Sequence, residues 1–112
     1  MKTRNHKSEP LKDNPHKVDV RILYDDPTAQ LVHISLHPGE ALKPHKTPVD
    51  VCFYILEGSP TISIGNESET HEKDTLIESP ANVVHYISNE SHTLSRILVI
   101  KAPRPTTQTK VL

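Results

Sequence analysis

The stretch Gly39-Glu40-Ala41-Leu42-Lys43-Pro44-His45 places a histidine six residues after a glycine that suits a turn. The chain then enters the apolar run Phe53-Tyr54-Ile55-Leu56-Glu57-Gly58, which ends at another turn glycine. A second histidine, His85, follows a proline-containing turn within residues 80–89. Each histidine is expected to enter a short β-strand, because glycine and proline punctuate the chain on either side. Two such strands can bring the two imidazoles together inside a small β-barrel, where they would bind a metal or a polar ligand.

The length and the distribution of polar residues predict one folded domain with two polar ends. A chain of 112 residues corresponds to a single domain. Only 34% of the residues are hydrophobic, and the polar excess is concentrated at the termini. We therefore predict a flexible N-terminal arm over residues 1–16, a barrel domain over residues 17–103 and a C-terminal tail over residues 104–112.

Short β-branched segments separated by turn residues predict an all-β fold. Alternation is clear in the segment 30–36, where apolar residues alternate with polar ones, and again in the segment 61–64. No window has a helical stripe. Many short strands without helices are typical of a β-sandwich or a closed barrel. The predicted strands are residues 18–23, 30–36, 51–56, 61–64, 75–77, 83–88 and 95–100.

Charge and composition exclude several classes of partner. The 13 basic residues nearly balance the 14 acidic ones, so no nucleic-acid partner is expected. The longest apolar run is far too short to cross a membrane, and no membrane partner is expected. Cys52 is the sole cysteine, which excludes an intramolecular disulfide. The polar N-terminus shows no signal peptide, and a cytoplasmic location is predicted.

Two motifs resemble those of the cupin family, in particular small single-domain, RmlC-like members with an incomplete metal-ligand set. The first motif matches at Gly39, His45 and Gly58, but Thr47 and Val51 stand where the family has a histidine and a glutamate. The second motif matches in spacing at three positions and replaces two glycines: the matches are Pro80, His85 and Asn89, and the replacements are Asp74 and Asn82. The resemblance implies a double-stranded β-helix, the jelly-roll barrel of two packed antiparallel sheets.

The resemblance also implies a metal site. The family holds iron, manganese, nickel or zinc with three histidines and one glutamate, and imidazole suits all four ions. Here only His45 and His85 match, so the site would be completed by Asp50, by water or by the substrate. Asp50 lies one residue before the family's glutamate, so it would need a β-bulge, which Pro48 could promote, to face the same way.

Two functional hypotheses follow. In the first, the two histidines hold a divalent metal that acts on a small organic substrate, in a dioxygenase-like or isomerase-like reaction. In the second, the protein is a non-catalytic small-molecule-binding or sensor module, and the histidines form hydrogen bonds to the ligand. Both hypotheses place a cavity inside the barrel, lined by Thr47, Val51, Phe53, Ile55 and Ile87. A homodimer is expected, because small barrels leave edge strands to be covered.

Several other residues are weaker candidates. His33 and His37 lie two apart on one strand face, which is allowed metal geometry but is more often a solvated face or a pocket rim. Glu78 could reach the cavity as a general base, although a surface role is the simpler interpretation. Cys52 is expected to face away from the ligand positions as a small apolar side chain.

Overall fold

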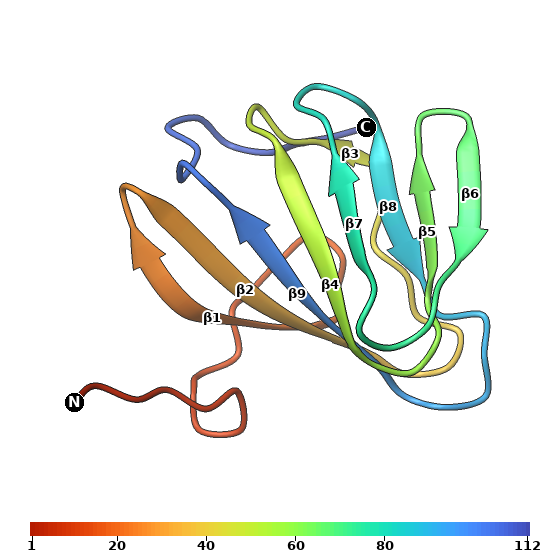
Figure 1. The fold of residues 1–112 in the computed structure, drawn as a ribbon, viewed down its shortest axis with the longest axis horizontal. Helices are drawn as coiled ribbons and strands as arrows, with labels where there is room; N and C mark the ends of the chain where they lie inside the picture. Colours follow the sequence, from red (N-terminus) through yellow and green to blue (C-terminus); the bar gives the residue numbers. More distant parts are fainter.

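The structure is a computed structural model that describes residues 1–112. It contains strands, turns and loops but no helix, and hence no helix that could cross a membrane (Figure 1). The strands are β1 Asp19–Asp26, β2 Ala29–Leu36, β3 His45–Lys46, β4 Val51–Glu57, β5 Thr61–Ile64, β6 Glu67–Thr70, β7 Leu76–Ser79, β8 His85–Ser88, β9 Ser95–Lys101 and β10 Lys110–Val111.

Two five-stranded sheets form the barrel. The first sheet has the order β1-β2-β9-β4-β7, and the second has the order β10-β3-β8-β5-β6. All neighbouring strands run antiparallel. In Figure 1 the first sheet extends from β1 to β7, and β8, β5 and β6 follow on the other side. The predicted all-β fold of two antiparallel sheets is confirmed.

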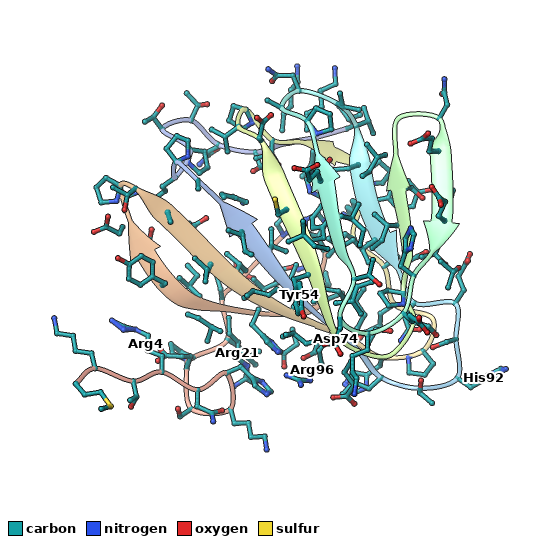
Figure 2. The ribbon with its side chains drawn as sticks, in the orientation of Figure 1. Arg4, Arg21, Tyr54, Asp74, His92 and Arg96 are labelled. Atoms are coloured by element: carbon teal, nitrogen blue, oxygen red, sulfur yellow. The ribbon has the colours of Figure 1, made fainter.

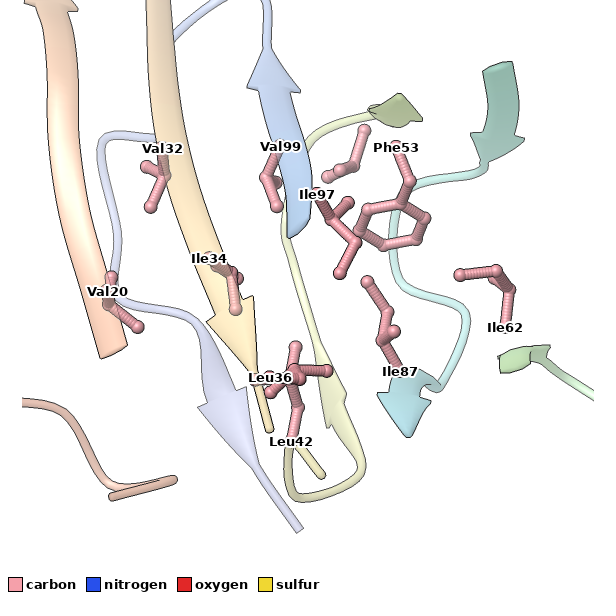
Figure 3. Packing of buried hydrophobic residues seen from close by; sticks show 11 residues of the cluster. Val20, Val32, Ile34, Leu36, Leu42, Phe53, Ile62, Ile87, Ile97 and Val99 are labelled. Carbon is pink, nitrogen blue, oxygen red and sulfur yellow. The ribbon is translucent and has the colours of Figure 1, made fainter. Parts of the chain in front are cut away.

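Alternation along the strands decides which side chains enter the barrel. In β4, Val51, Phe53 and Ile55 are buried, while the intervening Cys52 and Tyr54 are half-buried on the outer face. The inward side chains of both sheets meet in one core (Figure 3). Its members are Val20, Val32, Ile34, Leu36, Leu42, Val51, Phe53, Ile62, Ile87, Ile97 and Val99.

The turns use residues that tolerate left-handed backbone. Gly39 and Gly58 have φ of 87° and 80°. Asp74 and Asn82 stand where the resembled motif has glycine, and their φ values are 70° and 62°. Asn and Asp adopt this region more readily than other non-glycine residues, so the replacements keep the backbone path.

Both chain ends contact the barrel. The Arg21 guanidinium donates hydrogen bonds to the carbonyl oxygens of His6 and Glu9, both at 2.9 Å. Figure 2 shows Arg21 and Arg96 beside the N-terminal segment, below the first sheet. At the other end, β10 pairs with β3. The predicted mobility of the two ends stays a prediction.

Candidate functional site

The two motif histidines lie opposite each other. His45 in β3 pairs in register with His85 in β8, and their ring centroids are 4.6 Å apart at an interplanar angle of 71°. Both side chains point inward, with exposed fractions of 8% and 1%. Antiparallel pairing places directly opposite side chains on the same face, which explains why the rings meet.

Hydrogen bonds fix how these rings present their nitrogens. Nδ1 of His45 lies 2.7 Å from the carbonyl oxygen of Lys43 and must donate, because a carbonyl only accepts. Nε2 of His45 therefore carries a lone pair. In His85, Nδ1 lies 2.6 Å from Ser79 Oγ and Nε2 lies 3.2 Å from Thr47 Oγ1. Both nitrogens of His85 are thus satisfied by hydroxyl groups.

A third histidine joins the pair from the N-terminal segment. The ring of His16 lies 5.1 Å from that of His45, centroid to centroid. Its Nδ1 accepts the backbone N–H of Lys43 at 2.8 Å, so the ring proton of neutral His16 is on Nε2. His16 is therefore a hydrogen-bond donor toward its surroundings, whereas His45 offers an acceptor.

The cluster is uncharged at neutral pH. Burial is the main reason that the pKa of His85 falls to about 4, and repulsion between the protonated forms of His85 and His45 lowers it further. Burial is also the main reason that the pKa of His16 falls to about 4. For His45, burial lowers the pKa despite the opposing hydrogen bond to Lys43. Neutral imidazoles can bind a metal or form hydrogen bonds to an organic ligand.

The donor set around the two motif histidines fits a resident metal poorly. The carboxylate of Asp50 is exposed and accepts the backbone N–H of Ala81 at 2.8 Å, so it caps the neighbouring turn and does not join the histidines. No group of three or more histidine, cysteine or acidic side chains could hold an ion. The bulge required to turn Asp50 inward is absent, because β4 begins at the inward-facing Val51 in regular pairing with Ser79.

A cavity of about 530 Å³ lies under the β1-β2-β9 part of the first sheet. Seven apolar side chains form much of its wall: Val20, Ile22, Val32, Ile34, Leu42, Val99 and Val111. The two chain ends complete it with residues 12–16 and with Pro105, Thr107, Gln108 and Thr109. His16 is among these residues, so the cavity adjoins the histidine cluster.

The five side chains that we predicted to line the cavity do not line this one. Thr47, Val51, Phe53, Ile55 and Ile87 are all buried, and none belongs to the cavity wall. The reason is packing, because the Phe53 ring lies 5.2 Å from the His85 ring and fills that part of the barrel. In Figure 3, Phe53 and Ile87 lie on the far side of the core from Val20 and Val32.

A half-buried cation, Lys101, faces the cavity without a partner. Lys101 follows Ile97 and Val99 on the inward side of β9 and lines the cavity. No carboxylate lies within ion-pair distance of its ammonium group. Burial lowers the pKa of Lys101, and its charge also helps to lower the pKa values of His16, His45 and His85.

The weaker candidates lie outside the cavity. His33 points to the outer face of the first sheet, where it is 1% exposed and its ring stacks on His6 at 4.0 Å between centroids. His37 is exposed beyond the end of β2, so the two histidines form no joint site. Glu78 is exposed on β7, opposite Cys52 on the outer face.

Comparison with known proteins decides the family. The family model described as "Cupin domain" matches residues 32–101, which is more than half of the chain. This protein belongs to the cupin family. A search of curated proteins found no match to this cupin.

Solved structures similar to this cupin share the same fold. TT1209 from Thermus thermophilus is 28% identical with a TM-score of 0.79, and the match covers 94% of this chain and 100% of that protein. An RmlC-like cupin from Methanocaldococcus jannaschii is 24% identical with a TM-score of 0.75, covering 87% of this chain and 90% of its own. The polyketide cyclase RemF from Streptomyces resistomycificus is 17% identical with a TM-score of 0.84, and the match covers 100% of this chain and 85% of that protein. The likeness to the last two shows the fold alone.

Sequence reasoning missed two residues of this cupin's site. His16 lies in the segment that we expected to be an arm, and nothing in its local sequence indicates that it reaches the barrel. Lys101 could have been found, because the alternation Ile97, Val99, Lys101 predicts an inward side chain.

Proposed function

We propose that this cupin binds a small organic molecule in the cavity beneath β1, β2 and β9, with the polar end of the ligand toward His16 and Lys101. This is the small-molecule-binding hypothesis, and it needs no metal. The observation that carries it is a 530 Å³ cavity whose wall combines seven apolar side chains with polar side chains, most of them from the two chain ends. Small-molecule sites have this size, and they combine apolar walls with polar groups that orient the ligand.

The polar groups beside the cavity differ in the bonds that they offer. His16 supplies a donor at Nε2, and the unpaired Lys101 supplies a positive charge. The neighbouring His45 holds a lone pair at Nε2. A ligand with an apolar body and one polar group would be oriented by these side chains, while the aliphatic wall would supply the hydrophobic contribution to affinity.

A variant that fills the cavity tests this proposal. Ile22 lines the cavity and is half-buried, so Ile22→Trp is expected to occupy the space. Isothermal titration calorimetry with octanoate, 1-octanol and octylammonium should detect binding of at least one compound to the wild type. That binding should be lost in Ile22→Trp.

The matched control is Leu98→Trp, which adds the same ring to the outer face of the same sheet. It should bind like the wild type. The proposal is wrong if none of the three compounds binds, or if both variants bind as the wild type does.

The two-histidine metal centre is the second candidate, favoured by the free lone pair on His45 Nε2 beside His85. It would require His85 to exchange its bond to Thr47 for the ion, and water or substrate to fill the remaining positions. It predicts that protein purified without an affinity tag, then loaded with Zn²⁺ or Fe²⁺ and desalted, retains about one ion per chain. The double variant His45→Ala/His85→Ala should lose that ion in elemental analysis. Retention of metal by the double variant, or no retention by the wild type, would reject this candidate.

A homodimer, a cytoplasmic location and the absence of a nucleic-acid partner stay predictions.

A further inference from the structure

We infer that the ligand of this cavity is an organic anion with an apolar body, such as a monocarboxylate, and that Lys101 supplies its counter-charge. This inference rests on the proposed function, because it names the chemical class that the proposed site takes. It starts from a cation that the protein places against an apolar wall.

The placement of Lys101 follows from the sheet. Lys101 pairs with Gln30 of β2 on one side and Val51 of β4 on the other, so it sits in the middle of the first sheet and not at an edge. Its side chain enters the cavity on the same face as Val99. An ammonium group that is partly removed from water has lost hydration, and that loss is unfavourable unless an acceptor replaces the water.

The protein supplies no such acceptor for Lys101. By contrast, three arginines near the sheet have carboxylate partners: Arg21 with Asp19 at 3.0 Å, Arg96 with Glu57 at 2.7 Å, and Arg104 with Asp25 at 3.1 Å. The ammonium group of Lys101 makes no ion pair and no side-chain hydrogen bond. A charge left free inside a cavity is available to a ligand.

The other groups around the cavity favour an anion over a cation. Lys12 and Asp13 also line it, but both are exposed and their charges are opposite. His16 is neutral and presents a donor. No carboxylate lies within ion-pair distance of Lys101, so beside its ammonium group a ligand cation would meet repulsion, whereas a carboxylate would meet one charge and one donor.

The expected difference in affinity between octanoate and 1-octanol follows from the hydrogen bond that the carboxylate makes to Lys101. A hydrogen bond to a charged group contributes more to affinity than one between neutral groups, so octanoate is expected to bind at least about tenfold more tightly than 1-octanol. Octylammonium, which has the same chain and the opposite charge, should bind most weakly. All three compounds share the apolar body, so the comparison isolates the charged end.

Variants of Lys101 complete the test. Lys101→Met keeps the length of the side chain and removes the charge, so it should lose the preference for octanoate while it still binds 1-octanol at least as tightly as the wild type. Lys101→Arg keeps the charge and should keep the preference. Binding of 1-octanol by Lys101→Met also reports that the variant is folded with its cavity intact.

The outcomes distinguish a failure of the anion inference from a failure of the proposed ligand-binding function. If 1-octanol and octanoate bind the wild type equally and both are blocked by Ile22→Trp, the anion inference is overturned and the proposed function stands. If octanoate keeps its preference in Lys101→Met, the assignment of Lys101 is overturned. If none of the compounds binds the wild type, the proposed function itself fails.

Discussion

Lowering the pH from 7 to 5 is expected to reduce the free energy of unfolding by about 2 kcal/mol for each of His33 and His85. Both rings are 1% exposed, and burial is the largest cause that lowers each pKa to about 4. In the unfolded chain these rings titrate near 6.5, so between pH 6.5 and 4 the unfolded state binds more protons. Their contribution is fully present above pH 6.5 and is lost as the pH falls toward 4. Urea unfolding at a series of pH values measures this loss of the free energy of unfolding.

The outer-face histidine offers a clean variant for this prediction. Nε2 of His33 accepts a hydrogen bond from Arg96 at 3.0 Å, while its Nδ1 is buried without a partner. His33→Phe keeps a ring to stack on His6 and removes the titrating group. We expect this variant to lose the part of the acid-dependent change that His33 contributes, about 2 kcal/mol, while His92→Gln, at an exposed position, keeps the wild-type profile. A flat profile in the wild type, or an unchanged slope in His33→Phe, would contradict the assignment.

Gly58→Ala is expected to destabilise the protein by about 3 kcal/mol or more, which is the largest effect expected for any single substitution considered above. Gly58 has φ of 80°, and a Cβ added there would lie 2.5 Å from the carbonyl oxygen of Leu94 and 2.9 Å from Cα of Ser95. These are backbone atoms at the start of β9, so they cannot move without disturbing the sheet. Denaturant unfolding compares the variant with the wild type.

Gly39→Ala is the matched control for this substitution. Gly39 has a similar φ of 87°, but a Cβ there would meet nothing within 4 Å. Gly39→Ala should lower the free energy of unfolding only by the strain of a left-handed alanine, about 1–2 kcal/mol. Equal losses in the two variants would mean that the close approach at Gly58 contributes nothing.

The sequence predicts most of the first-sheet strands because burial leaves a pattern in them. Alternation of apolar and polar residues marks β2 and a continuous apolar run marks β4, and both were predicted within a few residues. β6 was missed because all four of its residues are exposed, so no apolar alternation marks it. β3 and β10 have only two residues each, which is too short for any periodic signal.

The candidate site was predictable only in part. Motif spacing found the histidine pair, because the two motifs of the resembled family place their histidines on strands that pair with each other. The cavity was misplaced, since its position depends on which side chains fill the barrel and on where the two chain ends run. The contact of His16 with Lys43 spans 27 residues, and nothing local in the sequence encodes such a contact.

The most direct test of a ligand site beneath β1, β2 and β9 is a methyl NMR titration with octanoate. Saturating octanoate should shift the methyl resonances of Val20, Val32 and Val99, which line the cavity, and leave those of Leu76 and Leu98 unchanged. Shifts confined to Leu76 and Leu98, with the three valines unaffected, would place the ligand on the outer face and contradict a site inside the barrel.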